Sequence, residues 1–224
     1  MSELVLTKRQ EERHNKLKQT LSYRIYKPLA PHTNEIRLMH IVNQSERSRD
    51  WVVGDELNIM EYKKFQMLEG EGIRSSLYVS HCKFACVECY NPISQIKGQG
   101  TPYTQELEQE ILTDMQNPNI SGLTLVGGEP MLNAKQLLPL VKRIKAETDK
   151  TVWSYTGYLF EVLLTLTDER RELLNYIDVL IDGQFIKEER DESNLATFRG
   201  SSNQRLIDVQ ESLRQNKTVL YDYQ

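Results

Sequence analysis

Cysteine is scarce in this chain of 224 residues, and none lies outside one short stretch. Three cysteines, an odd number, do not form the paired framework of a disulfide-rich secreted domain. No run of about 18 apolar residues is present, so no membrane span is expected. The N-terminus lacks the basic segment and apolar run that mark a secretory signal. These absences predict a soluble, cytoplasmic protein.

A strong charge of one sign is also lacking. The net charge of −4 gives no reason to expect nucleic-acid binding, and hydrophobic residues, at 39%, are enough for a core. The balance of Lys and Arg over Asp and Glu is +4 in residues 1–50 and −8 in the rest. We therefore predict an N-terminal extension over residues 1–55, with a helix, a linker and a short strand near 36–42, and a compact domain over residues 56–224. The extension reads as a solvated arm, or alternatively as a basic docking arm for an acidic partner.

Apolar runs and helical periodicity alternate through the compact domain. Thr104 is suited to cap a helix, and Pro139 is expected in the first turn of its helix or at a kink. Strands alternating with helices predict an α/β fold with a parallel sheet built from βα units. The expected strands are 57–65, 76–80, 122–126, 151–155, 177–181 and 218–221, and the expected helices are 104–115, 134–148, 158–176 (in one or two pieces) and 206–215.

Small or polar segments follow four of these strands. They are the cysteine stretch, Gly127–Pro130, Thr156-Gly157 and Asp182-Gly183. In parallel α/β sheets and barrels, binding sites form at the carboxyl ends of the strands. The four segments are therefore predicted to meet at one site.

Cys82, Cys86 and Cys89 have the spacing C-x3-C-x2-C. On a straight helix the outer two would stand about 10 Å apart, at ~1.5 Å rise per residue, so a shared centre requires a wrapped loop. Iron–sulfur cubanes are normally held by four thiolates, and three would leave one iron open for chemistry. The alternatives are a zinc site completed by His81 and an electron-transfer iron–sulfur module.

Gly127-Gly128-Glu129-Pro130 stands between an expected strand and a helix. Glycines allow a ligand to approach the backbone closely, and Glu129 can accept hydrogen bonds from an ammonium group. Alone, the tetrapeptide would read as an ordinary βα turn. Beside a three-cysteine loop, it is a candidate binding segment.

Together these motifs resemble the radical S-adenosylmethionine superfamily, and more closely the activating proteins of anaerobic (class III) ribonucleotide reductases. The resemblance runs from about Met60 to Asp222. Besides the cysteines and GGEP, it rests on residues 70–77, Cys89-Tyr90-Asn91, 153–158, 178–183 and 198–205. Two positions differ from the usual pattern: His81 stands where the family usually has glycine, and Glu88 where the superfamily often has an aromatic residue.

The resemblance implies an oxidoreductase with a partial TIM-like βα barrel. Cys82, Cys86 and Cys89 would hold a [4Fe-4S] cluster, whose open iron would be chelated by S-adenosylmethionine. Gly127, Gly128 and Glu129 would receive the ammonium end of S-adenosylmethionine, and Glu88, Cys89 and Tyr90 would face its adenosine part. Reductive cleavage would give a 5′-deoxyadenosyl radical that generates a glycyl radical on the large subunit of the reductase. A flavodoxin- or ferredoxin-type protein would donate the electron. A radical enzyme acting on a small molecule remains the alternative.

Several polar residues near the expected strand ends are weaker candidates. Asp182 would contact the cofactor or the incoming glycine loop, or simply cap a turn before Gly183. Residues 199–205 would shape the partner-docking face, or form a hydrogen-bonded loop that closes the sheet edge. The full set is Thr156, Tyr158, Asp182, Arg199, Ser201, Asn203 and Gln204.

Overall fold

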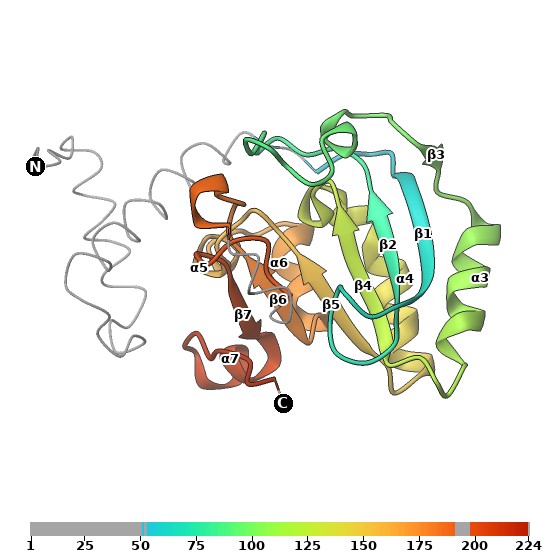
Figure 1. Ribbon diagram of the computed structural model, residues 1–224. Coiled ribbons are helices and arrows are strands. Elements are labelled where there is room, and N and C mark those ends of the chain that lie inside the picture. The colour runs from blue at the N-terminus through green and yellow to red at the C-terminus, as the bar shows by residue number, and fades with distance from the viewer. Residues whose placement is uncertain (1–50, 52, 191–197, 224) are drawn as a thin grey trace, which may run out of the picture.

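One seven-stranded sheet forms the centre of the molecule in the computed structural model, which describes residues 51, 53–190 and 198–223 (Figure 1). The strand order is β3-β1-β2-β4-β5-β6-β7. The strands are β1 (Asn58–Gln66), β2 (Arg74–Val79), β3 (Thr101–Pro102), β4 (Gly122–Gly127), β5 (Thr151–Tyr155), β6 (Val179–Asp182) and β7 (Arg205–Asp208). The predicted extension before residue 51 lies outside the described residues.

The middle of the sheet is parallel, and its margins are antiparallel. Strands β2, β4, β5 and β6 are consecutive neighbours and run in the same direction. Strand β1 is antiparallel to β2 and β3, and β7 is antiparallel to β6. The α/β class is therefore confirmed, and the four parallel strands bring their carboxyl ends to one edge.

Helices follow the strands as the sequence periodicity predicts. They are α3 (Gln105–Met115), α4 (Ala134–Glu147), α5 (Phe160–Leu164), α6 (Glu169–Leu173) and α7 (Val209–Gln215), with short 3-10 turns η2 (Ile93–Gln95), η3 (Pro130–Asn133), η4 (Leu174–Tyr176) and η5 (Lys187–Glu189). Thr104 caps α3 by accepting a hydrogen bond from the backbone N–H of Leu107. The stretch from 158 to 176 does divide into separate pieces, α5, α6 and η4. No helix in the described part of the chain is long and apolar enough to cross a membrane.

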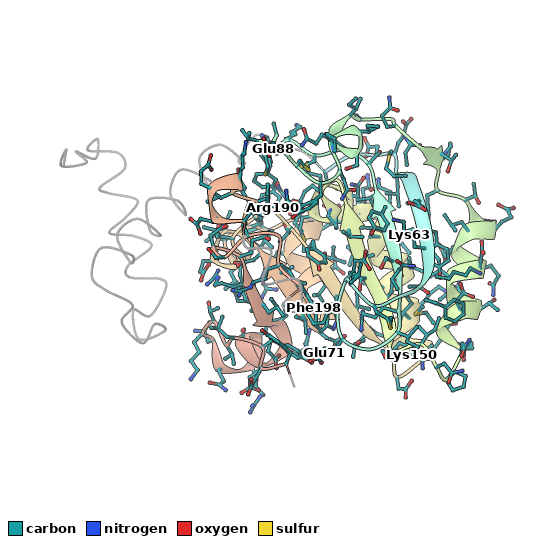
Figure 2. The ribbon with its side chains drawn as sticks, in the orientation of Figure 1. Lys63, Glu71, Glu88, Lys150, Arg190 and Phe198 are labelled. Carbon is teal, nitrogen blue, oxygen red and sulfur yellow. The ribbon has the colours of Figure 1, made fainter. Side chains whose placement is uncertain are left out.

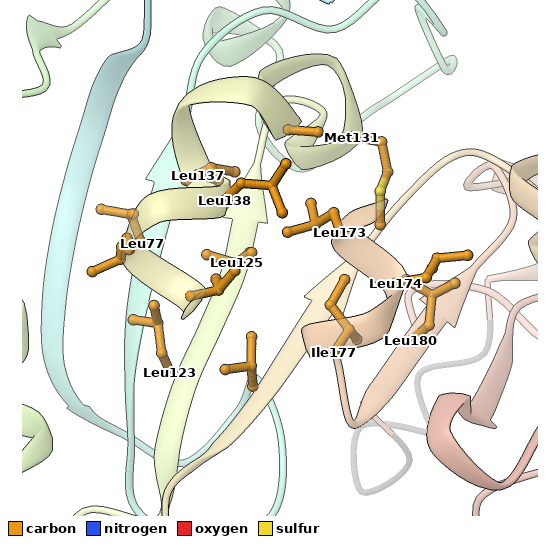
Figure 3. Close-up of a cluster of buried hydrophobic side chains, with 14 of the residues drawn as sticks. Leu77, Leu123, Leu125, Met131, Leu137, Leu138, Leu173, Leu174, Ile177 and Leu180 are labelled. Carbon is orange, nitrogen blue, oxygen red and sulfur yellow. The ribbon is translucent and has the colours of Figure 1, made fainter. Parts of the chain in front are cut away.

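The main core lies between one face of the sheet and the helices. Side chains of a strand alternate between the two faces, so Leu77, Leu123 and Leu125 point to the same side. Figure 3 shows them packed with Leu137 and Leu138 of α4, and all five are at most 5% exposed. Helix α4 contacts α3 and α6, which extends this layer across the sheet. The core holds the strands in register and so fixes where their ends lie.

The opposite face of the sheet carries a smaller apolar cluster. Trp153, Val179, Ile181 and Leu206 are its buried members, with Phe198 among the residues packed against them. Rings of Phe198 and Tyr221 meet the Trp153 ring edge-on at 5.5 and 5.4 Å. This second cluster fastens the C-terminal part of the chain to the sheet.

Two expectations for local structure were wrong, and one of the two alternatives predicted for Pro139, the first turn of its helix, is excluded. Residues 205–208 form β7, so the last helix begins only at Val209, because Leu206 and Ile207 pair with β6. The expected strand at 218–221 is reduced to one bridge between Ile207 and Leu220. Pro139 lies inside α4, beyond its first turn. Its missing N–H leaves the carbonyl of Lys135 without its helical donor, and Lys135 is exposed, where water can replace that donor.

Candidate functional site

The four predicted segments meet at one end of the sheet. The cysteine loop follows β2, and GGEP follows β4, its parallel neighbour. The N–H of Gly128 donates to the carbonyl of Val79 at 2.7 Å, and that of Glu129 to the carbonyl of His81 at 2.9 Å. In Figure 2, Glu88 marks this end, and Glu71 and Lys150 mark the opposite one. The predicted segments therefore lie at the same edge of the sheet, the carboxyl edge of the parallel strands.

The cysteine stretch is a wrapped loop. His81, Ala85 and Glu88 have φ angles of 72°, 51° and 53°, in the left-handed region that side chains other than glycine rarely adopt. Residues in this conformation interrupt extended or helical backbone and so bend the chain. The N–H of Cys89 reaches the carbonyl of Cys86 at 3.3 Å, which closes one of the turns. The wrapped loop that a shared centre requires, as inferred from the cysteine spacing, is therefore present.

The three thiols are half-buried and unpaired in disulfides. The backbone N–H of Asn91 donates to Sγ of Cys89 at 3.4 Å.

The surroundings of the loop keep two of these thiols protonated. Burial, together with the charge of Glu129, raises the pKa of Cys82 to about 12, and burial also raises the pKa of Cys86. Thiolates are the metal-binding form, so loading a metal centre here releases protons.

No site for a single metal ion is preformed at the cysteines. Within the described ranges, no three His, Cys, Asp or Glu side chains lie close enough together to hold one metal ion. In a cubane, each cysteine binds a different iron, so three thiolates on one loop can serve three of the four irons. Cys82, Cys86 and Cys89 remain the candidate ligands of a [4Fe-4S] cluster.

Gly127 and Gly128 allow the loop to pack on the end of β4. A Cβ on Gly128 would stand 2.8 Å from the carbonyl oxygens of both His81 and Ser94. A Cβ on Gly127 would stand 2.6 Å from the carbonyl oxygen of Val79, and its φ of 103° also favours glycine. The sequence suggested that these glycines leave room for a ligand. In the structure, the room that each glycine leaves is filled by backbone of β2 and the cysteine loop.

Glu129 is buried behind the loop, with only 1% of its surface exposed. Its Oε1 accepts hydrogen bonds from the N–H of Met131 at 3.0 Å and the hydroxyl of Thr156 at 2.8 Å, and its Oε2 accepts from the N–H of Gly157 at 2.8 Å. Burial raises the pKa of Glu129 to about 7, although these donors oppose the shift. The carboxylate thus joins the ends of β4 and β5.

Two predicted candidates, Thr156 and Tyr158, support this arrangement. The Thr156 hydroxyl donates to Glu129 and accepts the N–H of Tyr158 at 3.1 Å. The Tyr158 ring is fully buried, and its hydroxyl accepts a 2.9 Å hydrogen bond from Arg170. Both residues hold the turn after β5 in place.

Glu88 and Tyr90 connect the loop to the segment after β6. Glu88 forms an ion pair with Lys187 in η5. The Tyr90 ring is 56% exposed and lies 5.3 Å from the Phe185 ring, with the Arg190 guanidinium 4.9 Å from its centroid. An exposed ring beside the cysteines remains accessible to a ligand.

Asp182 is fully buried and ion-paired with Arg205. It also accepts the N–H of Phe160 at 2.9 Å, and Arg205 binds Glu161 through two hydrogen bonds of 2.9 and 2.8 Å. Burial opposes the Arg205 charge, but Asp182 and Glu161 raise its pKa well above the ordinary value. The sequence analysis did not identify Glu161, because the only indication of its role is that it is an acidic residue in an apolar helix.

The loop over residues 198–204 is hydrogen-bonded to the segment after β6. Asn203 donates to the carbonyl of Gln184, and Gln204 to that of Gly183, both at 2.8 Å. Arg199 donates to the carbonyl of Gln204, and the hydroxyl of Ser201 donates to Asn203. This arrangement matches one of the two alternatives predicted from the sequence, a hydrogen-bonded loop that closes the sheet edge.

Comparison with known proteins agrees with this site. The chain matches the family model described as "4Fe-4S single cluster domain" over residues 68–207, and that match defines its class. Relatives called "Anaerobic ribonucleoside-triphosphate reductase-activating protein" are 42% identical in Haemophilus influenzae and 35% in Escherichia coli K12, each over 153 residues, or 66% of this chain and 96% of the relative. The relative of that name in phage T4 is 37% identical over 145 residues, covering 62% and 86%. The chain belongs to the family of anaerobic ribonucleoside-triphosphate reductase-activating proteins.

Proposed function

We propose that this chain activates an anaerobic ribonucleoside-triphosphate reductase by generating a glycyl radical on its large subunit. The reduced [4Fe-4S] cluster would supply the electron that cleaves S-adenosylmethionine to methionine and a 5′-deoxyadenosyl radical, which takes a hydrogen atom from the glycine. The names of the relatives and the family match support the target and the cluster. The donor of the electron would be a flavodoxin- or ferredoxin-type protein.

Three sets of residues at the carboxyl edge would bind the cluster, the amino end of S-adenosylmethionine and its adenosine. Cys82, Cys86 and Cys89 would hold the cluster and would leave one iron for the amino and carboxylate groups of S-adenosylmethionine. Residues 127–129 would receive the amino end of S-adenosylmethionine. Burial raises the pKa of Glu129 to about 7, and N–H hydrogen bonds from an iron-bound amino group beside it would favour the ionised carboxylate. Residues 88–90 face the adenosine, with the exposed Tyr90 ring as a stacking surface.

The sheet supports the same proposal. Four consecutive parallel strands, with helices on one face, are compatible with an incomplete βα barrel of the radical S-adenosylmethionine type, which we propose for this chain. The chain would bind the cluster and S-adenosylmethionine at the carboxyl edge, exclude water there, and orient the sulfonium for reduction.

One observation carries the proposal. All three thiols lie on one loop at the carboxyl edge, and that loop is hydrogen-bonded through His81 and Val79 to the segment 127–129. A purely structural metal site would have a fourth protein ligand and would not require this neighbouring segment.

The test is a sequence of three measurements on the full chain. Anaerobic reconstitution with iron and sulfide is followed by iron and sulfide analysis. Reduction with S-adenosylmethionine present is followed by chromatography for 5′-deoxyadenosine. Addition of the reductase is followed by electron paramagnetic resonance spectroscopy for a glycyl radical. We expect four irons per chain, cleavage, and the radical signal.

Each measurement distinguishes the proposed function from one alternative. A colourless protein holding one zinc would contradict every radical mechanism. A cluster without cleavage would leave an electron-transfer module. Cleavage without a radical on the reductase would indicate a small-molecule substrate. The Cys86→Ala variant is the matched control, since it removes one thiolate.

A further inference from the structure

The segments that follow β2 and β6 contact each other at the carboxyl edge, although these two strands are not neighbours in the sheet. Glu88 of the cysteine loop forms an ion pair with Lys187. The Tyr90 ring lies 5.3 Å from the Phe185 ring, and the Arg190 guanidinium lies over the Tyr90 ring at 4.9 Å. We refer to these three contacts as the seam, and Glu88 and Arg190 mark its place in Figure 2.

The seam crosses the ends of β4 and β5, because both strands stand between β2 and β6. Glu129 after β4 and Gly157 after β5 are joined there by a 2.8 Å hydrogen bond, and Glu129 is 1% exposed. The cysteine loop and the seam therefore help to cover this buried carboxyl group.

The segment after β6 is the fixed side of the seam. The N–H of Ile186 donates to Oγ of Ser201 at 3.1 Å, and the N–H of Ser202 donates to the carbonyl of Glu189 at 2.8 Å. The Ser202 hydroxyl also donates to the Glu189 carboxylate at 3.0 Å. These bonds attach the segment to the loop over residues 198–204 and so restrict its movement.

The first half of the cysteine loop is also fixed. The N–H of Cys82 donates to the carbonyl of Gln95 at 3.1 Å. The Phe84 ring is 5% exposed, and it meets the Trp51 ring at 4.9 Å and the Tyr158 ring at 5.0 Å, both edge-on. The chain up to Phe84 is therefore anchored to the domain.

The second half of the loop, residues 85–90, faces the solvent. Val87 is 70% exposed and Tyr90 is 56% exposed, and the Glu88 side chain is 53% exposed. The seam holds this exposed half against the segment after β6. If the contacts of the seam break, this is the half of the loop that is released.

We propose that the seam is a gate. Residues 85–90 separate from the segment after β6 to expose Cys86 and Cys89, and the Glu88–Lys187 ion pair closes the loop again. The two charged side chains are 53% and 46% exposed, so water and salt weaken their attraction and the gate opens readily. The gate would admit iron and S-adenosylmethionine to the carboxyl edge, and that part of its role rests on the proposed function.

The opening is measured on the reduced, cluster-free full chain with a neutral thiol reagent at constant pH. All three cysteines of the chain lie in this loop, and trypsin cleaves after Lys83. Cys82 is therefore recovered in peptide 75–83, and Cys86 and Cys89 in peptide 84–97. Mass spectrometry of the modified peptides then reports on the two halves of the loop separately.

The variants change the ion pair without touching the cysteines. Glu88→Gln and Lys187→Met remove it, singly and together, and Glu88→Lys combined with Lys187→Glu exchanges the two charges. Lys142→Met is the matched control, because it breaks the Lys142–Glu172 pair between α4 and α6, whose side chains are 43% and 46% exposed.

We expect Glu88→Gln, Lys187→Met and their combination to speed the modification of Cys86 and Cys89 by the same factor, roughly two- to fivefold, the scale of an exposed ion pair. The exchanged charges should restore the wild-type rate. High salt should speed the wild type and leave Lys187→Met unchanged. The rate at Cys82, and all rates in Lys142→Met, should stay at the wild-type values.

Two results would overturn the gate. One is a wild-type rate at Cys86 and Cys89 in Lys187→Met. The other is an equal rise at Cys82 or in Lys142→Met, which would indicate general loosening of the fold. The rates are measured without a cluster, so a chain that binds no cluster would contradict the proposed function and leave this test intact.

Discussion

The N–H of Gly157 donates a 2.8 Å hydrogen bond to Oε2 of Glu129, and so joins the end of β5 to the end of β4. The carboxylate is 1% exposed and accepts two further hydrogen bonds through Oε1. A single buried side chain therefore couples two of the four segments at the carboxyl edge.

This burial predicts a pH dependence of the cluster-free protein. The folded-state pKa of Glu129 is raised to about 7 from an ordinary value of 4.5, so between these values the folded state keeps a proton that the unfolded state releases. The free energy of unfolding should be highest below the lower pKa and fall as pH rises through 7, by at most about 3 kcal/mol from this group. Urea titrations from pH 4.5 to 8 measure it.

Glu129→Gln is the matched variant, because it cannot ionise. Its stability is lower at acidic pH, since an amide matches only part of the three donors, but the fall between pH 5 and 8 should be smaller than in the wild type. Equal slopes for the two proteins would rule out Glu129 as the titrating group.

Gly128→Ala tests the contact between β4 and the cysteine loop. The added Cβ would stand 2.8 Å from two backbone carbonyl oxygens, of His81 and Ser94, and backbone cannot rotate away as a side chain can. We expect a loss of about 2–3 kcal/mol in unfolding free energy, on the scale of overpacking, together with weaker cluster retention.

Gly54→Ala provides the control for that substitution. Its Cβ would stand 3.6 Å from the nearest atom, an ordinary contact, so stability should stay within about 0.5 kcal/mol of the wild type. If both alanine variants behave alike, the close approach at Gly128 is not what restricts that position.

His81→Gly should relieve backbone strain in the loop. His81 has a φ of 72°, which glycine adopts without the steric conflict of a Cβ. We expect the cluster-free glycine variant to be more stable than His81→Ala by about 1 kcal/mol, because alanine loses the imidazole but keeps the strained backbone. Thermal unfolding of the two variants side by side measures the difference, and a more stable alanine variant would contradict it.

Cys86→Ala should abolish cluster binding and radical generation while leaving the fold. The Cys86 side chain is only half-buried on a loop outside the sheet, so the cluster-free variant should unfold within about 1 kcal/mol of the cluster-free wild type. Iron and sulfide content and circular dichroism check the two parts. Val87→Ala, at a side chain that is 70% exposed in the same loop, should retain the cluster. Activity unchanged in Cys86→Ala would refute the assignment of this ligand.

Much of this architecture was predictable because its signals are local. The periodicity of Leu137, Val141 and Ile144 predicts α4, and the apolar run 122–126 predicts β4. The cysteine spacing alone required a wrapped loop, which the positive φ angles of His81 and Glu88 provide.

What the sequence did not predict depends on contacts between distant residues. Leu206 and Ile207 fit a helix or a strand, and only pairing with β6 decides between them. The Arg205 contacts with Glu161 and Asp182 join residues that are 44 and 23 positions apart. The packing of Trp51 on Phe84 likewise has no signal in either residue's own neighbourhood.

The cysteine loop is an insertion between β2 and β3, and the main core of β2, β4, β5 and α4 closes on the side of the sheet that the helices cover. The hydrogen bonds that pair the parallel strands involve no residue of the cysteine loop. We therefore expect synthesis of the scaffold and its maturation to be separable in time. A chain that loses its cluster in air should stay folded and should bind a new cluster once anaerobic conditions return.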